Sequence, residues 1–131
     1  MSDREALFMY RREQALTTLS EAGKMHELGF SARTIINRAY YSMFYMVLAL
    51  FLKKGMATTT SKHSGIISLF DKEFILTGIF DRNLSRLLHR MFDKRMEFDY
   101  KDYSEPSITD AREAVDGARS FIEAVDQIFD N

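Results

Sequence analysis

Apolar side chains recur along most of the chain at steps of three and four residues, which is the period of an amphipathic α-helix. No segment alternates convincingly between apolar and polar positions, as a half-buried strand would. The pattern predicts one domain over residues 1–131, folded as an all-α antiparallel up-and-down helical bundle of four long helices and a short one. The predicted helices cover residues 4–22, with Gly23 loosening the end, 32–54, 66–74, 80–98 and a last segment that begins near Pro106.

The second predicted helix contains the most apolar stretch of the chain. Between Ala39 and Leu52 the only polar side chain is the hydroxyl of Ser42, apart from the tyrosines. A helix that is apolar nearly all round is central and packs on several faces. The apolar run has 14 residues, fewer than the roughly 20 that span a bilayer. We therefore interpret it as a core helix and expect no membrane span.

The composition indicates the cellular compartment of the protein and limits how it could bind nucleic acid. The formal net charge is −1, so bulk attraction for nucleic acid is absent and any phosphate binding has to be local. The chain has no cysteine, which excludes disulfides and thiolate metal sites and fits a reducing cytoplasm. The first residues carry charges and lack the apolar core of a signal peptide. We therefore predict a cytoplasmic protein with no cofactor and no metal site.

Two arginines fall on otherwise apolar helical stripes, Arg38 in the second helix and Arg95 in the fourth. A guanidinium does not lose its proton, so a buried one needs carboxylate, phosphate or carbonyl partners. Glu97, Asp99 and Asp102 are close in sequence to Arg95. One interpretation is an internal salt-bridge cluster at one end of the bundle, which the spacing alone favours. The other is a phosphate-binding pocket, because the planar guanidinium fits phosphate oxygens.

Other polar residues near these arginines are less specific. His63 lies in the polar segment before the third helix, where a lone histidine is more often a surface or capping group than a catalyst. Tyr100 and Tyr103 follow Arg95, where aromatic rings could stack on a base or close the core. The sequence contains no HExxH pair, no glycine-rich phosphate loop and no convincing Ser-His-Asp pattern.

Three motifs together resemble those of a known family, the HEPN domain (higher eukaryotes and prokaryotes nucleotide-binding). They are Asn37-Arg38-Ala39-Tyr40-Tyr41-Ser42-Met43-Phe44, Lys62-His63-Ser64-Gly65 and Arg95-Met96-Glu97-Phe98-Asp99-Tyr100. The resemblance covers nearly the whole chain and is strongest to the small stand-alone prokaryotic members. It implies an up-and-down helical bundle, commonly a homodimer with the polar residues of both subunits facing a shared cleft. It also implies a metal-independent RNase, or a toxin paired with a small nucleotidyltransferase.

The family signature is an arginine followed, after four to six residues, by a histidine. Arg95 matches the arginine, but Tyr100 stands five positions later and no histidine follows Arg95 in this chain. His63 is the only histidine in the three motifs and is therefore the expected proton carrier near neutral pH. The resemblance suggests these candidates: Arg95, His63 and Tyr100 as catalytic residues, and Asn37, Arg38, Tyr41 and Asp99 as nucleotide- or phosphate-binding residues.

The residues and the resemblance are compatible with two functions. The first is an HEPN-like protein that binds nucleotide or RNA phosphate, as the toxin-like RNase half of a pair with a small nucleotidyltransferase. The alternative is a catalytically silent dimeric interaction module that docks a partner protein. A homodimer is expected in both, because closed two-fold dimers are the commonest way to bury leftover apolar surface. The side chains expected to supply that surface are Met43, Phe44, Tyr45 and Met46.

Overall fold

The computed structural model describes residues 2–58, 60–100 and 105–130, and for Tyr100 only the backbone. Within these ranges every regular element is helical and no residue lies in a strand, which confirms the predicted all-α class. The elements, in chain order, are α1 (Asp3–Glu27), α2 (Ala32–Lys53), α3 (His63–Phe70), the π-helical turn η1 (Asp71–Ile75), α4 (Arg82–Tyr100), α5 (Ile108–Asp126) and the 3₁₀ turn η2 (Gln127–Asp130).

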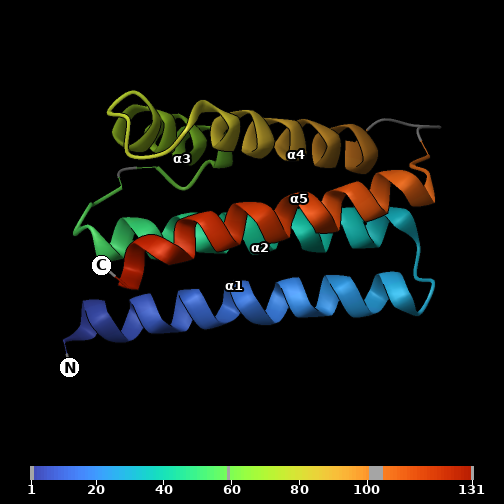
Figure 1. Cartoon of the computed structure of the whole chain (residues 1–131), viewed down its shortest axis with the longest axis horizontal. Helices are drawn as coiled ribbons and strands as arrows, with labels where there is room; N and C mark the ends of the chain where they lie inside the picture. Colours follow the sequence, from blue (N-terminus) through green and yellow to red (C-terminus); the bar gives the residue numbers. More distant parts are fainter. Residues whose placement is uncertain (1, 59, 101–104, 131) are drawn as a thin grey trace.

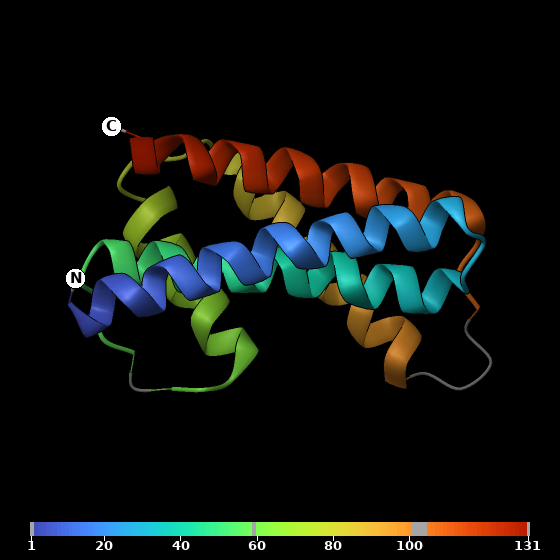
Figure 2. The same cartoon turned by 90° about the horizontal axis from the view of Figure 1, so that it is seen from below.

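The four long helices alternate in direction along the chain, as an up-and-down bundle requires (Figure 1). α2 lies in the middle of the bundle and contacts α1, α4 and α5. Figure 2 shows that α1 and α5 run along α2, whereas α4 crosses it obliquely. Because of this crossing, the last turns of α4 lie against the first half of α2.

α2 is the core helix that its apolar pattern predicted. At 22 residues it is long and apolar enough to cross a membrane by length and composition alone. However, 67% of its most apolar window is buried against the rest of the chain. The hydroxyl of Ser42, which is fully buried, donates a hydrogen bond to the carbonyl oxygen of Ala39 at 2.6 Å. Packing on several faces therefore accounts for its apolar character.

The same packing buries side chains that were predicted to leave apolar surface for a second copy of the chain. Met43 and Met46 are fully buried within one chain, and Phe44 is only 7% exposed. Tyr45 is half-buried. The prediction that these side chains leave apolar surface for a second copy was therefore wrong, since their own chain already covers most of it. The homodimer itself stays a prediction.

The first helix is longer than predicted, because α1 continues through Gly23 to Glu27. A glycine in a helix interior weakens the helix by about 1 kcal/mol relative to alanine, which tertiary packing readily offsets. Here Ala22 is fully buried and Met25 packs against the core. The helix ends at Glu27. Two residues later Gly29 has a positive φ of 77°, which allows Phe30 N to donate to Met25 O at 2.9 Å.

The last helix begins with a capping box. Ser107 Oγ accepts from the backbone N–H of Asp110 at 3.1 Å, and Asp110 Oδ2 accepts from the backbone N–H of Ser107 at 2.8 Å. Two backbone donors that the first turn of a helix leaves unpaired are thereby satisfied. Pro106 lies just before this cap, close to the position that was predicted for it.

Candidate functional site

Several predicted residues come together where the end of α4 crosses α2. Asn37 and Tyr41 lie one turn apart on α2 and therefore share a face. Arg95 and Asp99 are related in the same way on α4, and His63 is the first residue of α3. These residues, with two aromatic side chains described below, form the Arg95 cluster: Asn37, Tyr40, Tyr41, Phe44, His63, Arg95 and Asp99.

Arg95 is held on several sides. Its Nε donates to Asp99 Oδ2 at 3.2 Å and its Nη2 donates to Tyr41 Oη at 3.1 Å. Asn37 Nδ2 donates to the same carboxylate oxygen of Asp99 at 3.1 Å. The guanidinium carbon lies 5.5 and 5.3 Å from the ring centres of Tyr40 and Tyr41, within cation–π range. The Arg95 side chain is only 12% exposed, and its predicted pairing with Asp99 is confirmed.

His63 lies among aromatic rings. Its Nδ1 is 2.8 Å from Tyr40 Oη, and its ring stacks on Phe44 with the centres 3.9 Å apart and the planes at 17°. The ring of Tyr41 meets it edge-on at 5.6 Å. Burial lowers the pKa of His63, and the positive charge of Arg95 lowers this pKa further. The imidazole is therefore neutral at neutral pH.

Tyr40 is the buried partner of that histidine. Burial raises the pKa of its phenol; the nearby charge of Arg95 opposes this rise, and Tyr41 adds to it. The net pKa is above its ordinary value, so the hydroxyl keeps its proton throughout the neutral range. Tyr40 is fully buried, whereas His63, which its hydroxyl group contacts, is half-buried.

Arg38 does not join the Arg95 cluster. Its Nη2 pairs with Glu21 Oε1 of α1 at 3.3 Å, and its side chain is 33% exposed. The predicted cluster of Arg38 and Arg95 with shared carboxylates was therefore wrong. Successive residues of an α-helix point about 100° apart, so when Asn37 faces α4, Arg38 turns toward α1.

Some predicted residues are beyond what the structure describes. The side chain of Tyr100 and the whole of Asp102 and Tyr103 lie outside the described residues. The backbone of Tyr100 forms the last residue of α4. Glu97, which was considered as a partner for the arginines, is exposed on α4.

Tyr40 and Phe44 belong to the apolar run of the second predicted helix, and their contacts with His63 were not predicted from the sequence. A signal was present for Tyr40, because a tyrosine on the most apolar helix of a chain needs a hydrogen-bond partner for its hydroxyl. Nothing in the sequence identified that partner as His63, which lies 23 residues away along the chain. For Phe44 there was no signal beyond its inclusion in the first motif.

A second group of polar side chains lies outside the Arg95 cluster, where η1 meets α4. Asp71 accepts from Ser85 Oγ at 2.7 Å, and its other oxygen is 2.6 Å from His89 Nε2. His89 is an exposed residue whose side chain is 47% accessible. In the described part of the chain no three histidine, aspartate or glutamate side chains are arranged to hold a metal ion.

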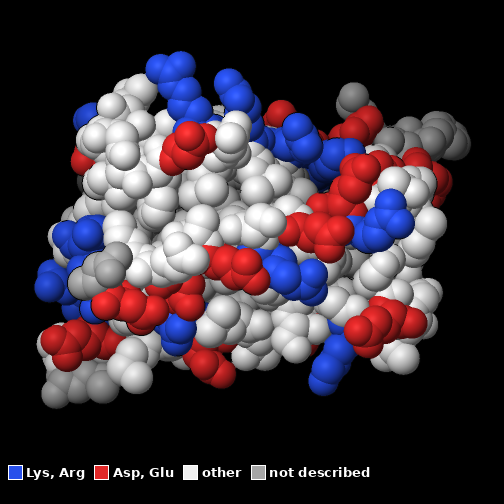
Figure 3. Space-filling view, viewed as in Figure 1, with Lys and Arg blue, Asp and Glu red and all other residues white. Residues whose placement is uncertain are grey.

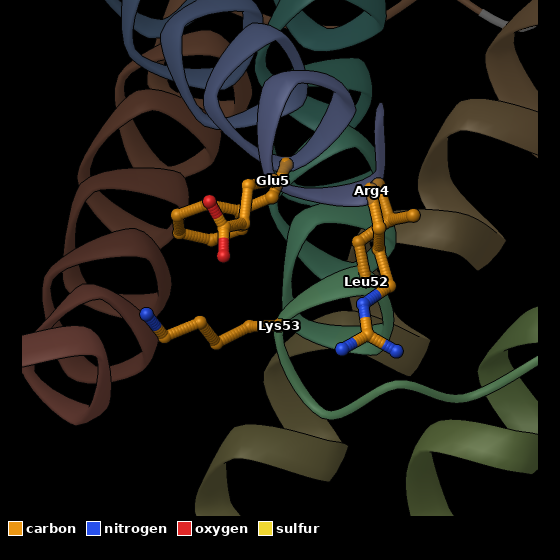
Figure 4. A pocket seen from close by; sticks show the side chains of 5 residues that line it. Arg4, Glu5, Leu52 and Lys53 are labelled. Atoms are coloured by element: carbon orange, nitrogen blue, oxygen red, sulfur yellow. The ribbon is translucent and has the colours of Figure 1, made fainter. Parts of the chain in front are cut away.

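A small hollow opens between the start of α1 and the end of α2 (Figure 4), lined by Arg4, Glu5, Phe8, Leu52 and Lys53. Its volume is about 140 Å³, below the roughly 300 Å³ at which ligand sites begin. On α2 this hollow lies about 16 Å from the cluster, because Leu52 follows Tyr41 by eleven residues at about 1.5 Å each. It is therefore separate from the candidate site.

Charges of both signs are interspersed over the face of the molecule shown in Figure 3. Basic side chains are spaced along the edge where Figure 1 draws α4, with acidic groups between and below them. This face therefore has no broad surface of one sign, in keeping with the net charge of −1. Attraction for a phosphate has to come from individual cations such as Arg95.

The fold and the cluster together define a small helical-bundle protein with an arginine–histidine site, and comparison with known proteins identifies the family. The HEPN domain model matches residues 8–128. A UPF0332 protein of Thermotoga maritima is 31% identical over 131 residues, which is 100% of this chain and 97% of that protein. The chain therefore belongs to the HEPN domain family, as the three motifs predicted.

Two further relatives come from Methanocaldococcus jannaschii and are named "Putative toxin MJ0142" and "Putative toxin MJ0605". The first is 42% identical over 65 residues, which is 50% of this chain and 43% of that protein. The second is 27% identical over 93 residues, which is 71% of this chain and 67% of that protein. Similarity thus extends to proteins whose names describe them as toxins.

Proposed function

We propose that this HEPN protein binds the phosphate group of a nucleotide or of RNA at the Arg95 cluster. The observation that supports this most directly is that Arg95 of α4 and His63 of α3 lie against the same two aromatic rings, those of Tyr40 and Tyr41. Arg95 supplies a permanent positive charge with several N–H donors, the combination that suits phosphate oxygens. Asn37 and Tyr41 hold that guanidinium and its carboxylate partner Asp99 in place.

The more specific form of the proposal is a toxin-like, metal-independent RNase that works in the cytoplasm with a small nucleotidyltransferase as its antitoxin partner. The names of the two Methanocaldococcus relatives and the resemblance of the motifs support this form. In such a reaction Arg95 would stabilise the negative charge that develops on the phosphate in the transition state. An adjacent gene for a small nucleotidyltransferase, and co-purification of its product, would support the pairing.

A second candidate function is a catalytically silent module that dimerises and docks a partner protein. Two observations favour it: Arg95 is already paired with Asp99, and no histidine follows Arg95 in the sequence. In this case the Arg95 cluster serves to join α2, α3 and α4, and phosphate has no effect on the protein.

Phosphate binding is tested by thermal unfolding in the presence of inorganic phosphate. A ligand at 100 times its Kd stabilises the folded state by about 2.7 kcal/mol. We expect phosphate to raise the Tm of the wild type and to leave the Tm of Arg95→Ala unchanged, with sulfate-free chloride buffer of equal ionic strength as the control. Equal shifts in both proteins would contradict binding at Arg95, and no shift would favour the docking module.

Catalysis is tested by incubating the purified protein with RNA in the presence of a chelator. We expect Arg95→Ala and His63→Ala each to lower cleavage by roughly 10²–10³-fold, the usual effect of removing one transition-state hydrogen-bond donor. The matched control is His89→Ala, which removes an imidazole outside the cluster and should leave cleavage unchanged. Cleavage that persists in Arg95→Ala would contradict the site assignment.

A further inference from the structure

The contact between Tyr40 and His63 determines where the proton of the imidazole resides. Tyr40 is fully buried, and its hydroxyl oxygen lies 2.8 Å from His63 Nδ1. No other hydrogen bond to this hydroxyl occurs among the described residues. A buried O–H needs an acceptor, and Nδ1 accepts only when it carries no proton. The neutral imidazole therefore has its proton on Nε2.

The opposite arrangement is less favourable. If Nδ1 carried the proton and donated it to Tyr40, the hydroxyl proton of Tyr40 would be buried without an acceptor. A carboxylate in place of the phenol would reverse the preference, as the aspartate of a Ser-His-Asp triad does. Across the described ranges, however, no carboxylate oxygen lies within 4.0 Å of a His63 nitrogen.

The second ring nitrogen of His63 points away from Tyr40 and remains available. Nε2 has no hydrogen-bond partner within the described part of the chain, yet it is not among the buried unpaired nitrogens there. It is therefore accessible to solvent. Stacking on Phe44, with the ring centres 3.9 Å apart, holds the plane of the imidazole, so that the direction of its Nε2–H is fixed as well.

We propose that Tyr40 positions His63 as a neutral imidazole protonated at Nε2, which donates a hydrogen bond to a bound phosphate oxygen beside Arg95. The proposal rests on the phosphate-binding function proposed above and assigns His63 its role in it. This role replaces the proton carrier expected from the sequence, because a nitrogen that already holds a proton cannot remove one from a 2′-hydroxyl. Tyr40 is a positioning residue that acts through His63.

Nitrogen-15 NMR of the imidazole rings in the free wild-type protein at neutral pH tests the tautomer without any ligand. The signals of His63 are identified by their loss in His63→Gln. We expect Nδ1 to give the signal of an unprotonated nitrogen and Nε2 that of a protonated one. A proton on Nδ1, with or without one on Nε2, would overturn the proposal even if phosphate binds.

The positioning role of Tyr40 is tested with Tyr40→Phe. This change removes only the hydroxyl, and we expect it to shift the Nδ1 signal and to weaken inorganic phosphate binding by about 3- to 10-fold, the effect of one neutral hydrogen bond. The control is Tyr45→Phe on the same helix, whose hydroxyl makes no hydrogen bond among the residues that are described. Circular dichroism verifies that both variants fold. A folded Tyr40→Phe with unchanged signals and affinity would overturn the role.

The donor role of His63 is tested by comparing two substitutions. Glutamine keeps an N–H donor near the position of Nε2 but cannot act as a base, whereas alanine keeps neither. We expect phosphate affinity to stay within about threefold of the wild type in His63→Gln and to fall roughly 10- to 100-fold in His63→Ala, the range for a hydrogen bond to a charged group. Equal losses would overturn the donor role. Failure of the wild type to bind phosphate would instead contradict the proposed function.

Discussion

At the scale of single residues, two arginines of similar sequence setting have different environments. The side chains of Arg95 and its partner Asp99 are 12% and 21% exposed, whereas those of Arg38 and Glu21 are 33% and 48% exposed. Water screens the second pair more strongly, so its contribution to stability is smaller. The burial of an ion pair, and not its presence, therefore decides how much its loss destabilises the fold.

We predict that Arg95→Ala lowers the free energy of unfolding by about 1–3 kcal/mol, between the values for exposed and fully buried pairs. Arg38→Ala, the matched control, should lower it by less than about 1 kcal/mol. Urea denaturation of the three proteins measures both differences. Equal losses in the two variants would show that Arg95 has no special structural role and would leave anion binding as its main function.

At the scale of the elements, packing overrides local preference in α1. Gly23 lies inside this helix, although an isolated helix is weakened there. A Cβ built on Gly23 would lie 3.9 Å from its nearest neighbour, Arg119 Nη2, which is an ordinary contact. An alanine side chain would therefore fit at position 23 without a steric clash.

We predict that Gly23→Ala raises the free energy of unfolding by about 0.5–1 kcal/mol, because alanine is the better helix former. Gly117→Ala in α5 serves as the control. A Cβ there would lie 2.9 Å from Leu87 Cδ1, so displacement of Leu87 should offset the gain. Thermal or urea unfolding measures both changes, and a destabilised Gly23→Ala would show that α1 needs flexibility at this point.

At the scale of the whole molecule, the apolar side chains on its surface bear on assembly. Large apolar side chains remain exposed on the described part of one chain: Leu7, Met9, Tyr10, Leu28, Phe30, Leu76, Ile79, Met96 and Ile108. Single exposed apolar residues are common on monomers. These side chains are therefore compatible with a dimer interface but do not by themselves indicate one. The resemblance to the small HEPN proteins favours a homodimer.

We predict that the protein is a homodimer at micromolar concentration, with two-fold symmetry as the commonest arrangement. Light scattering coupled to size exclusion should give twice the chain mass of 15.3 kDa. A dilution series provides the control, because a specific dimer dissociates at a defined concentration. A mass of one chain at all concentrations would contradict the prediction and any cleft formed by two subunits.

The sequence by itself determined the helical class, the order of the helices and the family. These properties depend on apolar periodicity, on the residues at helix ends and on short motifs, all of which are local in the chain. The pairing of Arg95 with Asp99 could be predicted for the same reason, since the two residues lie one turn apart on one helix.

Only the tertiary structure decided which faces of these helices meet. Because α4 crosses α2, Asn37 forms a hydrogen bond with Asp99 of α4, whereas Arg38 forms an ion pair with Glu21 of α1. The return of the chain after α2 brings His63 to Tyr40, and that contact places the proton of the imidazole. Such contacts depend on the rotation of each helix about its axis and on the packing of segments that are distant in the chain. The pattern of apolar and polar residues along the sequence does not predict either of these. For this reason the fold could be predicted from the sequence, whereas the chemistry of the Arg95 cluster required the packed molecule.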